Sequence, residues 1–517
     1  MKLNKLYTYL ILAFLVGFNA CTSNFEDINA PKYEVSDEDM QGDNFALGAF
    51  FPQLQDNAFP AQENSYQMNE NLIGDVYGRY MMTSNDGWNS SNFSVYNAPE
   101  GWVKYPFNDV MSKIYTAWNE IRKQTDGEGV NFAWAQILRV AAMQRITDMY
   151  GPIPYTKVDK GDLKVAYDSQ EDVYKAMFED LTNAIDVLTT YVSANPASRP
   201  MADFDGVYAG DYKQWVRFAN SLKLRMAIRV RFADPALAKE MAEEAVNHTI
   251  GVMESNADNA TYNYSKGNPI YVMWSSYTDT RVAADITSYM NGFEDPRRAK
   301  YFKLSTIDGA EDQYVGLRSG AAVTSKAWAL EYSAPNVERT DALLWMSASE
   351  MAFAKAEGAV AGWNMGGTAE YFYNQGIKLS FEQWGVSGAD DYLNNSARTQ
   401  ANYNDPKGKY PANASSTITI KWDDSVSEVV KLERIITQKW IALWPIGQEA
   451  WSEYRRTGFP HIFPVAQKVS PSIPVANRIP LSSDEYLNNA ENMPAALQHL
   501  GGSDNYATKL WWDKYRN

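Results

Sequence analysis

Residues 132–155 read FAWAQILRVAAMQRITDMYGPIPY, and their apolar positions recur at the spacing of a helix. The residues that share this spacing, three or four positions apart, are Leu138, Ala142, Ile146 and Met149. Side chains at such intervals lie on one face of an α-helix, so we expect this face to be buried. Gly151 and the prolines at 152 and 154 then end the helix and fix the following turn. The sequence therefore predicts one long helix with a buried face.

The same helical spacing occurs in three further segments of the first half of the chain. Their apolar sets are Val110, Ile114, Ala117 and Ile121; Val173, Met177, Leu181, Ile185 and Leu188; and Trp215, Phe218, Leu222, Met226 and Val230. Ser169 and Asp172 stand at the spacing of a capping box and predict where the second of these helices begins.

Two helix pairs are predicted in the second half. The helices of these pairs cover residues 347–360 and 369–384, and about 428–444 and 448–456. Helices joined by such short turns pack antiparallel, as in tetratricopeptide hairpins, although no exact repeat period is visible. The sequence therefore predicts a mainly α fold with little β structure.

The start of the chain has the pattern of a secretory signal. Two lysines precede an apolar run over 9–18, which is too short for a membrane span of about 20 residues. A small residue then precedes Cys21, the only cysteine, which is where bacterial lipoprotein processing attaches lipid. We expect a signal peptide over 1–20, and a lipidated Cys21 followed by a flexible acidic tether over 21–42. The alternative is ordinary secretion with Cys21 as a free thiol.

The charge of the chain disfavours nucleic acid as a partner. The formal net charge is −16 at pH 7, whereas phosphate backbones need a basic face that displaces counterions. A basic stripe, expected to pair with carboxylates across a helix interface rather than to bind an acidic ligand, contains Arg217, Lys223, Arg225, Arg229 and Arg231. Because no second long apolar stretch follows Cys21, membrane contact is expected through the lipid anchor only.

Motifs of enzyme chemistry are largely missing from the sequence. The three histidines, His248, His461 and His499, stand far apart, and no HExxH, CxxC, GxSxG or nucleotide-binding glycine motif occurs. An EF-hand begun at Asp203 would carry Gln214 where it needs Glu, so this segment is interpreted as an acidic turn. We therefore predict no enzyme and no cofactor, with structural calcium left open. A helical-barrel glycosidase remains an alternative, because it needs only two carboxylates in an aromatic groove.

Long irregular stretches combine aromatic rings with amide side chains. Residues 85–106, 256–277 and 390–416 show few helical spacings, and loops of this length are uncommon without a function. A Trp or Tyr ring covers the flat C–H face of a sugar, while amides satisfy its hydroxyls. The ligand-binding candidates are therefore Trp88, Tyr96, Trp102, Trp274 and Tyr277. The alternative for each ring is that it packs its loop against the helical body.

Several segments share one order along the chain with a known family. They are residues 132–155, Asn220–Arg225, Asp295–Arg297, Glu350–Gly362, Gln438–Trp440, Trp451–Gly458 and Lys509–Asp513. Together they resemble the SusD/RagB family over essentially the whole chain after the signal segment. The resemblance implies a single SusD-like α-helical domain over 43–517, built of tetratricopeptide-like helix pairs that carry long irregular ligand-binding loops. No motif in the aromatic loops allows ligand residues to be transferred from the family.

The resemblance also implies a function in nutrient import. Members of the family are lipid-anchored at the outer face of the outer membrane in Bacteroidetes, and each acts with a SusC-like TonB-dependent barrel. We therefore expect the protein to capture an oligosaccharide or polysaccharide at the cell surface and deliver it to such a barrel, breaking no bond. A peptide-binding role in the same import system is the first alternative. A helical-barrel glycoside hydrolase and a purely structural role are further alternatives.

Overall fold

The computed structural model describes residues 45–158, 164–469 and 475–515. Contacts divide the chain into two units, residues 1–49 and 50–517. In the first unit the described residues form the short helix α4 (Phe45–Gly48). The expected signal peptide, Cys21 and the acidic tether lie outside the described residues, and one domain over 43–517 stays a prediction. All that follows concerns the second unit.

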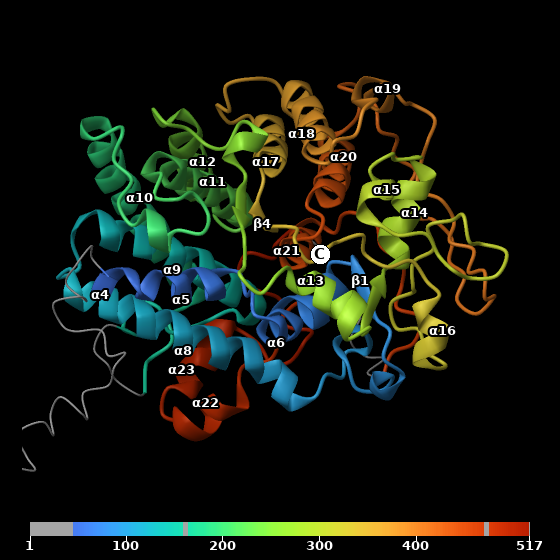
Figure 1. Cartoon of the computed structure of the whole chain (residues 1–517), viewed down its shortest axis with the longest axis horizontal. Coiled ribbons are helices and arrows are strands. Elements are labelled where there is room, and N and C mark those ends of the chain that lie inside the picture. The colour runs from blue at the N-terminus through green and yellow to red at the C-terminus, as the bar shows by residue number, and fades with distance from the viewer. Residues whose placement is uncertain (1–44, 159–163, 470–474, 516–517) are drawn as a thin grey trace, which may run out of the picture. The chain divides into compact units, whose positions relative to one another are not determined.

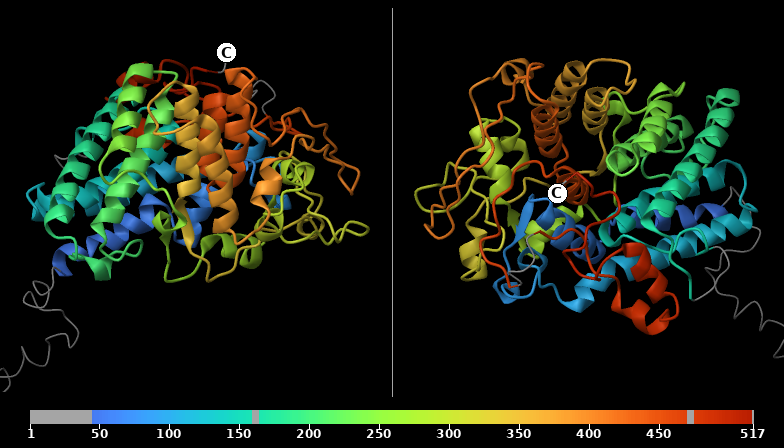
Figure 2. Two further views of the ribbon diagram at one scale, coloured as in Figure 1. Left: turned by 90° about the horizontal axis from the view of Figure 1, so that it is seen from above. Right: turned by 180° about the vertical axis from the view of Figure 1, so that it is seen from behind.

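Long helices make up most of the second unit, and neighbours in sequence pack against each other. They are α5 (Phe50–Ala58), α8 (Glu100–Gln124), α9 (Gly129–Tyr150), α10 (Gln170–Ala194), α11 (Tyr212–Val230), α12 (Pro235–Asn247), α17 (Ala348–Val360), α18 (Ala369–Gln383), α20 (Glu428–Ala442) and α21 (Gly447–Thr457). Each helix from α8 to α11 packs against the next one, and α17 packs against α18 and α20. Helices α8 to α11 and α17, α18 and α20 stand side by side in Figures 1 and 2, coloured from cyan through green to orange. The predicted mainly α fold of helix pairs is confirmed.

Short elements connect the long helices. The α-helical ones are α6 (Glu63–Tyr66), α7 (Asp75–Tyr77), α13 (Pro269–Tyr271), α14 (Ala284–Gly292), α15 (Arg298–Tyr301), α16 (Lys326–Leu330), α19 (Ala389–Leu393), α22 (Ser483–Asn488) and α23 (Met493–Leu500). The π-helices are η2 (Gln67–Gly74) and η8 (Val272–Ser276), and the 3₁₀ helices are η3 (Asp86–Trp88), η4 (Phe93–Val95), η6 (Ala202–Phe204) and η7 (Asn256–Asp258).

Strands are few and short within the described ranges. β1 (Met81–Thr83) pairs antiparallel with β3 (Thr280–Val282), and Thr83 lies opposite Thr280. β2 (Ala260–Tyr262) pairs antiparallel with β4 (Leu343–Met346). The prediction of little β structure is therefore confirmed, and these two ladders hold together segments that are far apart in sequence.

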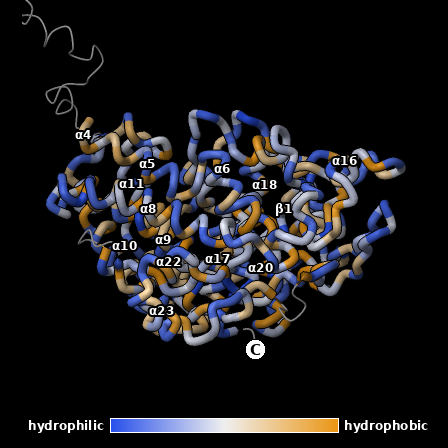
Figure 3. The backbone as a smooth tube through the Cα atoms, turned by 90° about the horizontal axis from the view of Figure 1, so that it is seen from below, coloured by the Kyte–Doolittle hydropathy of each residue, from blue (hydrophilic) through white to orange (hydrophobic). Residues whose placement is uncertain are grey.

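The apolar stripes read from the sequence are the buried faces of the long helices. All members of the four sets named above, in α8, α9, α10 and α11, are buried. The Ser169 side chain accepts the backbone N–H of Asp172 at 3.1 Å, so it caps α10 as predicted. Ser347 caps α17 in the same way, through the N–H of Glu350 at 3.3 Å. In Figure 3 hydrophobic and hydrophilic segments alternate along the chain. Within the described residues, no helix is both long and apolar enough to cross a membrane.

The stretch 85–106 is more regular than the sequence suggests. It contains η3 and η4, and its last third is the start of α8, so Trp102 lies on a helix rather than in a loop. Pro106 lies inside α8, although a proline lacks the N–H that bonds to the residue four positions earlier. The stretch 256–277 likewise contains η7, β2, α13 and η8.

The helices meet around a buried network of charged side chains. Nε and Nη2 of Arg225 donate to the carboxylate of Glu350 at 2.7 and 2.6 Å. Arg229 contacts Glu449, and its Nη1 donates to Glu453 at 2.7 Å. Its Nε lies 3.2 Å from Oδ2 of Asp148 in α9. The expectation that the basic stripe pairs with carboxylates across a helix interface is therefore confirmed for these two arginines.

Electrostatics favours the ionised form of two glutamates in this network, Glu453 and Glu449. Burial acts to raise the pKa of Glu453, but Arg456, Lys439 and Arg229 outweigh it and hold that pKa well below its ordinary value. Burial likewise acts to raise the pKa of Glu449, but Arg229 outweighs this effect and the pKa is lowered. The network thus joins α9, α11, α17, α20 and α21 through charges that compensate one another.

Helix α21 approaches the η2–α7 segment closely, and glycine makes this approach feasible. A Cβ at Gly447 would lie 2.4 Å from the backbone N of Asp75, and a Cβ at Gly78 would lie 2.5 Å from the carbonyl oxygen of Gly447. A Cβ added at Gly101, in the first turn of α8, would meet no neighbouring atom within 4 Å.

Gly447→Ala is therefore expected to lower the free energy of unfolding by about 1–3 kcal/mol, because the backbone must shift to admit the methyl group. Gly101→Ala, as the matched control, is expected to leave stability unchanged or raise it by up to about 1 kcal/mol, because alanine favours helix. Urea unfolding of both variants measures the difference. Equal stability of the two would contradict the close approach.

Candidate functional site

The β1–β3 ladder brings the two stretches that carry the aromatic candidates to one place. The backbone N–H of Ser84 donates to the carbonyl of Asp279 at 2.9 Å, and Oγ of Ser84 donates to the carbonyl of Thr278 at 2.8 Å. Because the strands are antiparallel, the chain leaving β1 and the chain entering β3 lie at the same end of the ladder. The loop with Trp88 therefore runs beside the segment with Tyr277.

Asp279 connects the segments around this end of the ladder. Its Oδ1 accepts hydrogen bonds from Asn85 at 3.1 Å and from Nζ of Lys326 at 2.8 Å. Its Oδ2 accepts one from Gln67 at 3.4 Å. Lys326 also donates to the carbonyl of Tyr277 at 2.7 Å. Asp279 and Lys326 thus connect η2, the start of η3, the end of η8 and α16.

Trp88 and Trp102 form a pair of half-buried rings. Their ring centroids lie 5.0 Å apart in an edge-to-face arrangement, and Phe93 stacks on Trp102 at 6.3 Å. Nδ2 of Asn92 donates to the carbonyl of Trp88 at 2.7 Å. Asn89 exchanges two hydrogen bonds with the backbone of Val323, at 2.8 and 2.7 Å. Amide side chains therefore hold this loop, and part of each indole faces solvent.

Trp274 and Tyr277 are also half-buried and anchored. Nε1 of Trp274 donates to the carbonyl of Val337 at 2.8 Å, and Nζ of Lys303 lies 4.9 Å from its ring. The hydroxyl of Tyr277 donates to the exposed Asn64 at 3.2 Å. Trp274 and Tyr277 thus each make a hydrogen bond that holds their segment in place, and each residue still exposes part of its surface. Loop packing and availability to a ligand are therefore compatible here. The role of both rings in ligand binding stays a prediction.

Tyr96 lies apart from the open surface. It is 4% exposed, adopts a left-handed backbone with φ of 59°, and lines a cavity of about 270 Å³. The other side chains of this cavity include Tyr77, Arg79, Trp451, Phe463 and Lys468. The sequence did not indicate this cavity, because its residues come from η4, α7, α21 and the segment after it, which meet only in the folded chain.

Polar groups of this cavity are buried without hydrogen bonds. Nε and Nη1 of Arg79 and the hydroxyl of Tyr77 have no hydrogen-bond partner among the described residues. Burial raises the pKa of Tyr77 well above its ordinary value, so the hydroxyl keeps its proton and is a donor. Burial also raises the pKa of Asp285 nearby, although Arg79 and Arg318 favour its charged form. The cavity therefore offers donors and positive charge.

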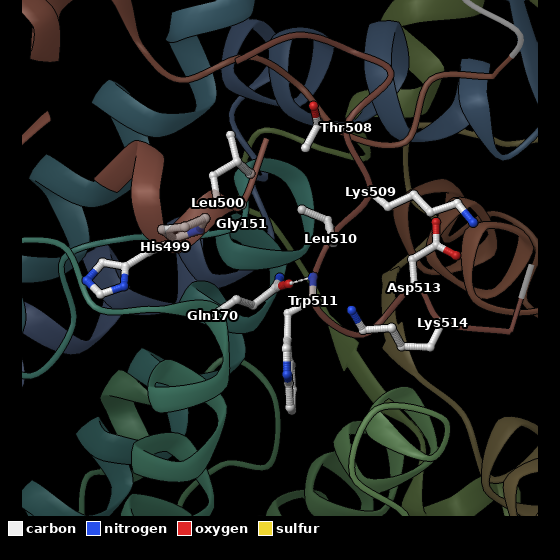
Figure 4. Close-up of a pocket in the computed structure, with 12 residues that line it drawn as sticks. Gly151, Gln170, His499, Leu500, Thr508, Lys509, Leu510, Trp511, Asp513 and Lys514 are labelled. Carbon is white, nitrogen blue, oxygen red and sulfur yellow. Dashed lines mark hydrogen bonds between the residues drawn. The ribbon is translucent and has the colours of Figure 1, made fainter. Parts of the chain in front are cut away.

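Two other cavities contain none of the candidate aromatic residues. One of about 550 Å³ lies beside α23 at the closing Lys509–Asp513 motif, and Figure 4 shows the backbone N–H of Trp511 bonded to Gln170 there at 2.9 Å. The other, of about 530 Å³, lies between α8 and α22 and includes Asp484 and Glu485. Lys104 lowers the pKa of Asp484, the opposite of what a glycosidase acid requires. In the described parts of the chain, no group of three or more His, Cys, Asp or Glu is placed to hold a metal ion.

Comparison with known proteins gives one consistent result. A family model described as SusD-like, "Susd and RagB outer membrane lipoprotein", matches residues 27–513. A crystal structure of a SusD homologue from Bacteroides uniformis is 43% identical, covers 91% of this chain and 99% of its own, and has a TM-score of 0.86. A chitin-binding SusD homologue from Flavobacterium johnsoniae is 38% identical, with the same coverage and TM-score. No curated protein sequence is significantly similar to this chain.

Proposed function

Since this chain belongs to the SusD and RagB family of outer membrane lipoproteins, we propose that it captures a glycan at the cell surface and delivers it to a SusC-like TonB-dependent barrel. The observation that carries the proposal is the β1–β3 ladder, which joins two loops of half-buried aromatic rings and amide side chains. Lipidation of Cys21 would hold the protein to the outer membrane, with no other membrane contact. The protein would act as a binding protein, not as an enzyme.

Sugar chemistry fits the residues that the ladder brings together. The faces of Trp88, Trp102, Trp274 and Tyr277 are apolar enough to cover sugar C–H groups, and neighbouring amides offer both donors and acceptors. The side chains of Trp274 and Tyr277 are anchored before ligand arrives, through Val337 and Asn64, so they lose little freedom on binding. Asn92 holds the backbone at Trp88. The similarity to a chitin-binding homologue makes chitin oligosaccharides one natural member of a ligand panel.

Trp88→Ala and Trp274→Ala are each expected to weaken glycan binding about 2- to 13-fold, because a stacked ring contributes about 0.5–1.5 kcal/mol beyond its buried area. Calorimetric titration with chitin oligosaccharides, neutral and acidic plant polysaccharides, and peptides measures this effect. Trp511→Ala is the control, since it removes a half-buried indole from the cavity near α23.

Three results would count against this proposal. Binding of peptides alone would favour the peptide-importing alternative within the same system. Release of shorter sugars by the pure protein would favour a hydrolase. Equal loss of affinity in Trp511→Ala would mean that the two candidate loops are not where the glycan lies.

A further inference from the structure

We infer that the cavity beside Tyr96 binds the carboxylate of an acidic sugar residue. This inference rests on the proposed glycan-binding function and adds a ligand class to it. It starts from the cavity of about 270 Å³ lined by Tyr77, Arg79, Tyr96, Phe463 and Lys468. Ligand sites for whole drug-sized molecules span roughly 300–1,000 Å³, so this cavity suits one charged ring rather than a chain.

The hydrogen-bond donors of the cavity lack acceptors. Arg79 is 5% exposed and Tyr77 is 7% exposed, and among the described residues neither Nε nor Nη1 of Arg79 nor the Tyr77 hydroxyl has a partner. Buried polar groups are nearly always satisfied in folded proteins, so three such atoms in one cavity point to an external acceptor. A carboxylate has two acceptor oxygens and matches the planar fork of a guanidinium.

Basic side chains lie at the cavity, and Asp285 faces them. Arg79 and Lys468 line it, and Arg318 lies within electrostatic reach, bonded through Nη2 to the carbonyl of Pro464 at 2.6 Å. The facing carboxylate is Asp285, whose Oδ1 accepts the N–H of Phe463 at 2.7 Å. Asp405 also acts on Arg318, so the cation that lines the cavity with donors lacking a partner among the described residues is Arg79.

Ring contacts connect the cavity with the aromatic loops. Phe93 stacks on Trp102 at 6.3 Å and meets Tyr77 edge-on at 5.9 Å. Tyr77 in turn stacks on Tyr96 at 6.3 Å. Packed rings thus join the wall of the cavity to the Trp88–Trp102 pair, with Phe93 buried between them.

The experiment compares oligogalacturonates with their carboxyl-reduced, neutral counterparts of the same length. Titration of the wild-type protein is expected to show at least tenfold tighter binding of the acidic form. Arg79→Gln is expected to weaken that form roughly 10- to 100-fold and the neutral form less than about twofold, because it removes only the charged donor. Lys175→Gln, which removes an exposed charge from α10, is the control and is expected to change neither. Should Arg79→Gln fail to fold, Tyr77→Phe removes one donor and keeps the ring.

The outcomes separate the two proposals. Equal binding of acidic and neutral forms, or no effect of Arg79→Gln and Tyr77→Phe, would overturn the carboxylate site and leave glycan capture intact. Absence of binding by every glycan, chitin oligosaccharides included, would overturn glycan capture itself. A peptide that binds through its free carboxyl end, loses affinity in Arg79→Gln and competes with no sugar would replace the acidic sugar as occupant.

Discussion

Replacing Arg229 with methionine is expected to lower the free energy of unfolding by about 3–5 kcal/mol. Arg229 is fully buried and faces Asp148, Glu449 and Glu453. Methionine keeps much of the side-chain volume and removes the charge, so three buried carboxylates lose their shared partner. Urea unfolding at pH 7, followed by circular dichroism, measures the change. Lys175→Met, which breaks an exposed pair with Glu171, is the control and should cost at most about 0.5 kcal/mol.

The penalty for Arg229→Met is also expected to shrink as the pH falls from 7 toward 4. In the wild-type protein the pKa values of Glu449 and Glu453 are depressed, so their stabilising effect is complete above the ordinary glutamate pKa and is lost only at lower pH. Without Arg229 these pKa values rise, and protonation at mildly acidic pH relieves the unpaired charges. A penalty that stays constant between pH 7 and pH 4 would contradict this account.

Trp134→Ala is expected to cost about 3–5 kcal/mol of unfolding free energy. The ring is fully buried in α9, stacks on Phe51 of α5 at 3.9 Å, and lies 5.6 Å from Trp215 of α11. Its removal leaves a void where three helices meet, and rigid backbones close such a void only in part. Thermal and urea unfolding both measure the loss.

Trp134→Phe is the matched control for that void. Nε1 of Trp134 has no hydrogen-bond partner among the described residues, so phenylalanine keeps most of the packing and removes an unsatisfied donor. We expect a cost below about 1.5 kcal/mol. Similar losses for alanine and phenylalanine would show that the indole makes a polar contact essential to the core.

Sequence alone predicts the helical body well because a buried helix face repeats within one short segment. The stripe of Leu138, Ala142, Ile146 and Met149 needs no knowledge of its partners to be recognised. The caps at Ser169 and Ser347 are equally local, since each side chain bonds to a backbone N–H three residues later. Arg225 and Arg229 were assigned correctly to ion pairs because so many charges cannot be buried unpaired.

The site is less accessible to sequence reasoning because its parts meet only through tertiary contacts. Composition identified Trp88, Tyr96, Trp102, Trp274 and Tyr277, yet nothing local indicated that β1 would pair with β3 some two hundred residues later. Strands of three residues carry too little alternation to be recognised. Arg79 and Tyr77 were likewise not predicted as site residues. Whether their donors find acceptors depends on neighbours that are distant in sequence.

The β1–β3 ladder also bears on how such a protein can diversify. The bonds of the ladder itself, and the adjoining one from Ser84 to Asp279, run between backbone groups, which every residue except proline can supply. Substitutions at the loop tips therefore leave the attachment points in place, and the arginine–glutamate centre of the helices lies on other elements. Under the proposed function, residues at the loop tips can change the ligand that is bound while the helical scaffold stays intact.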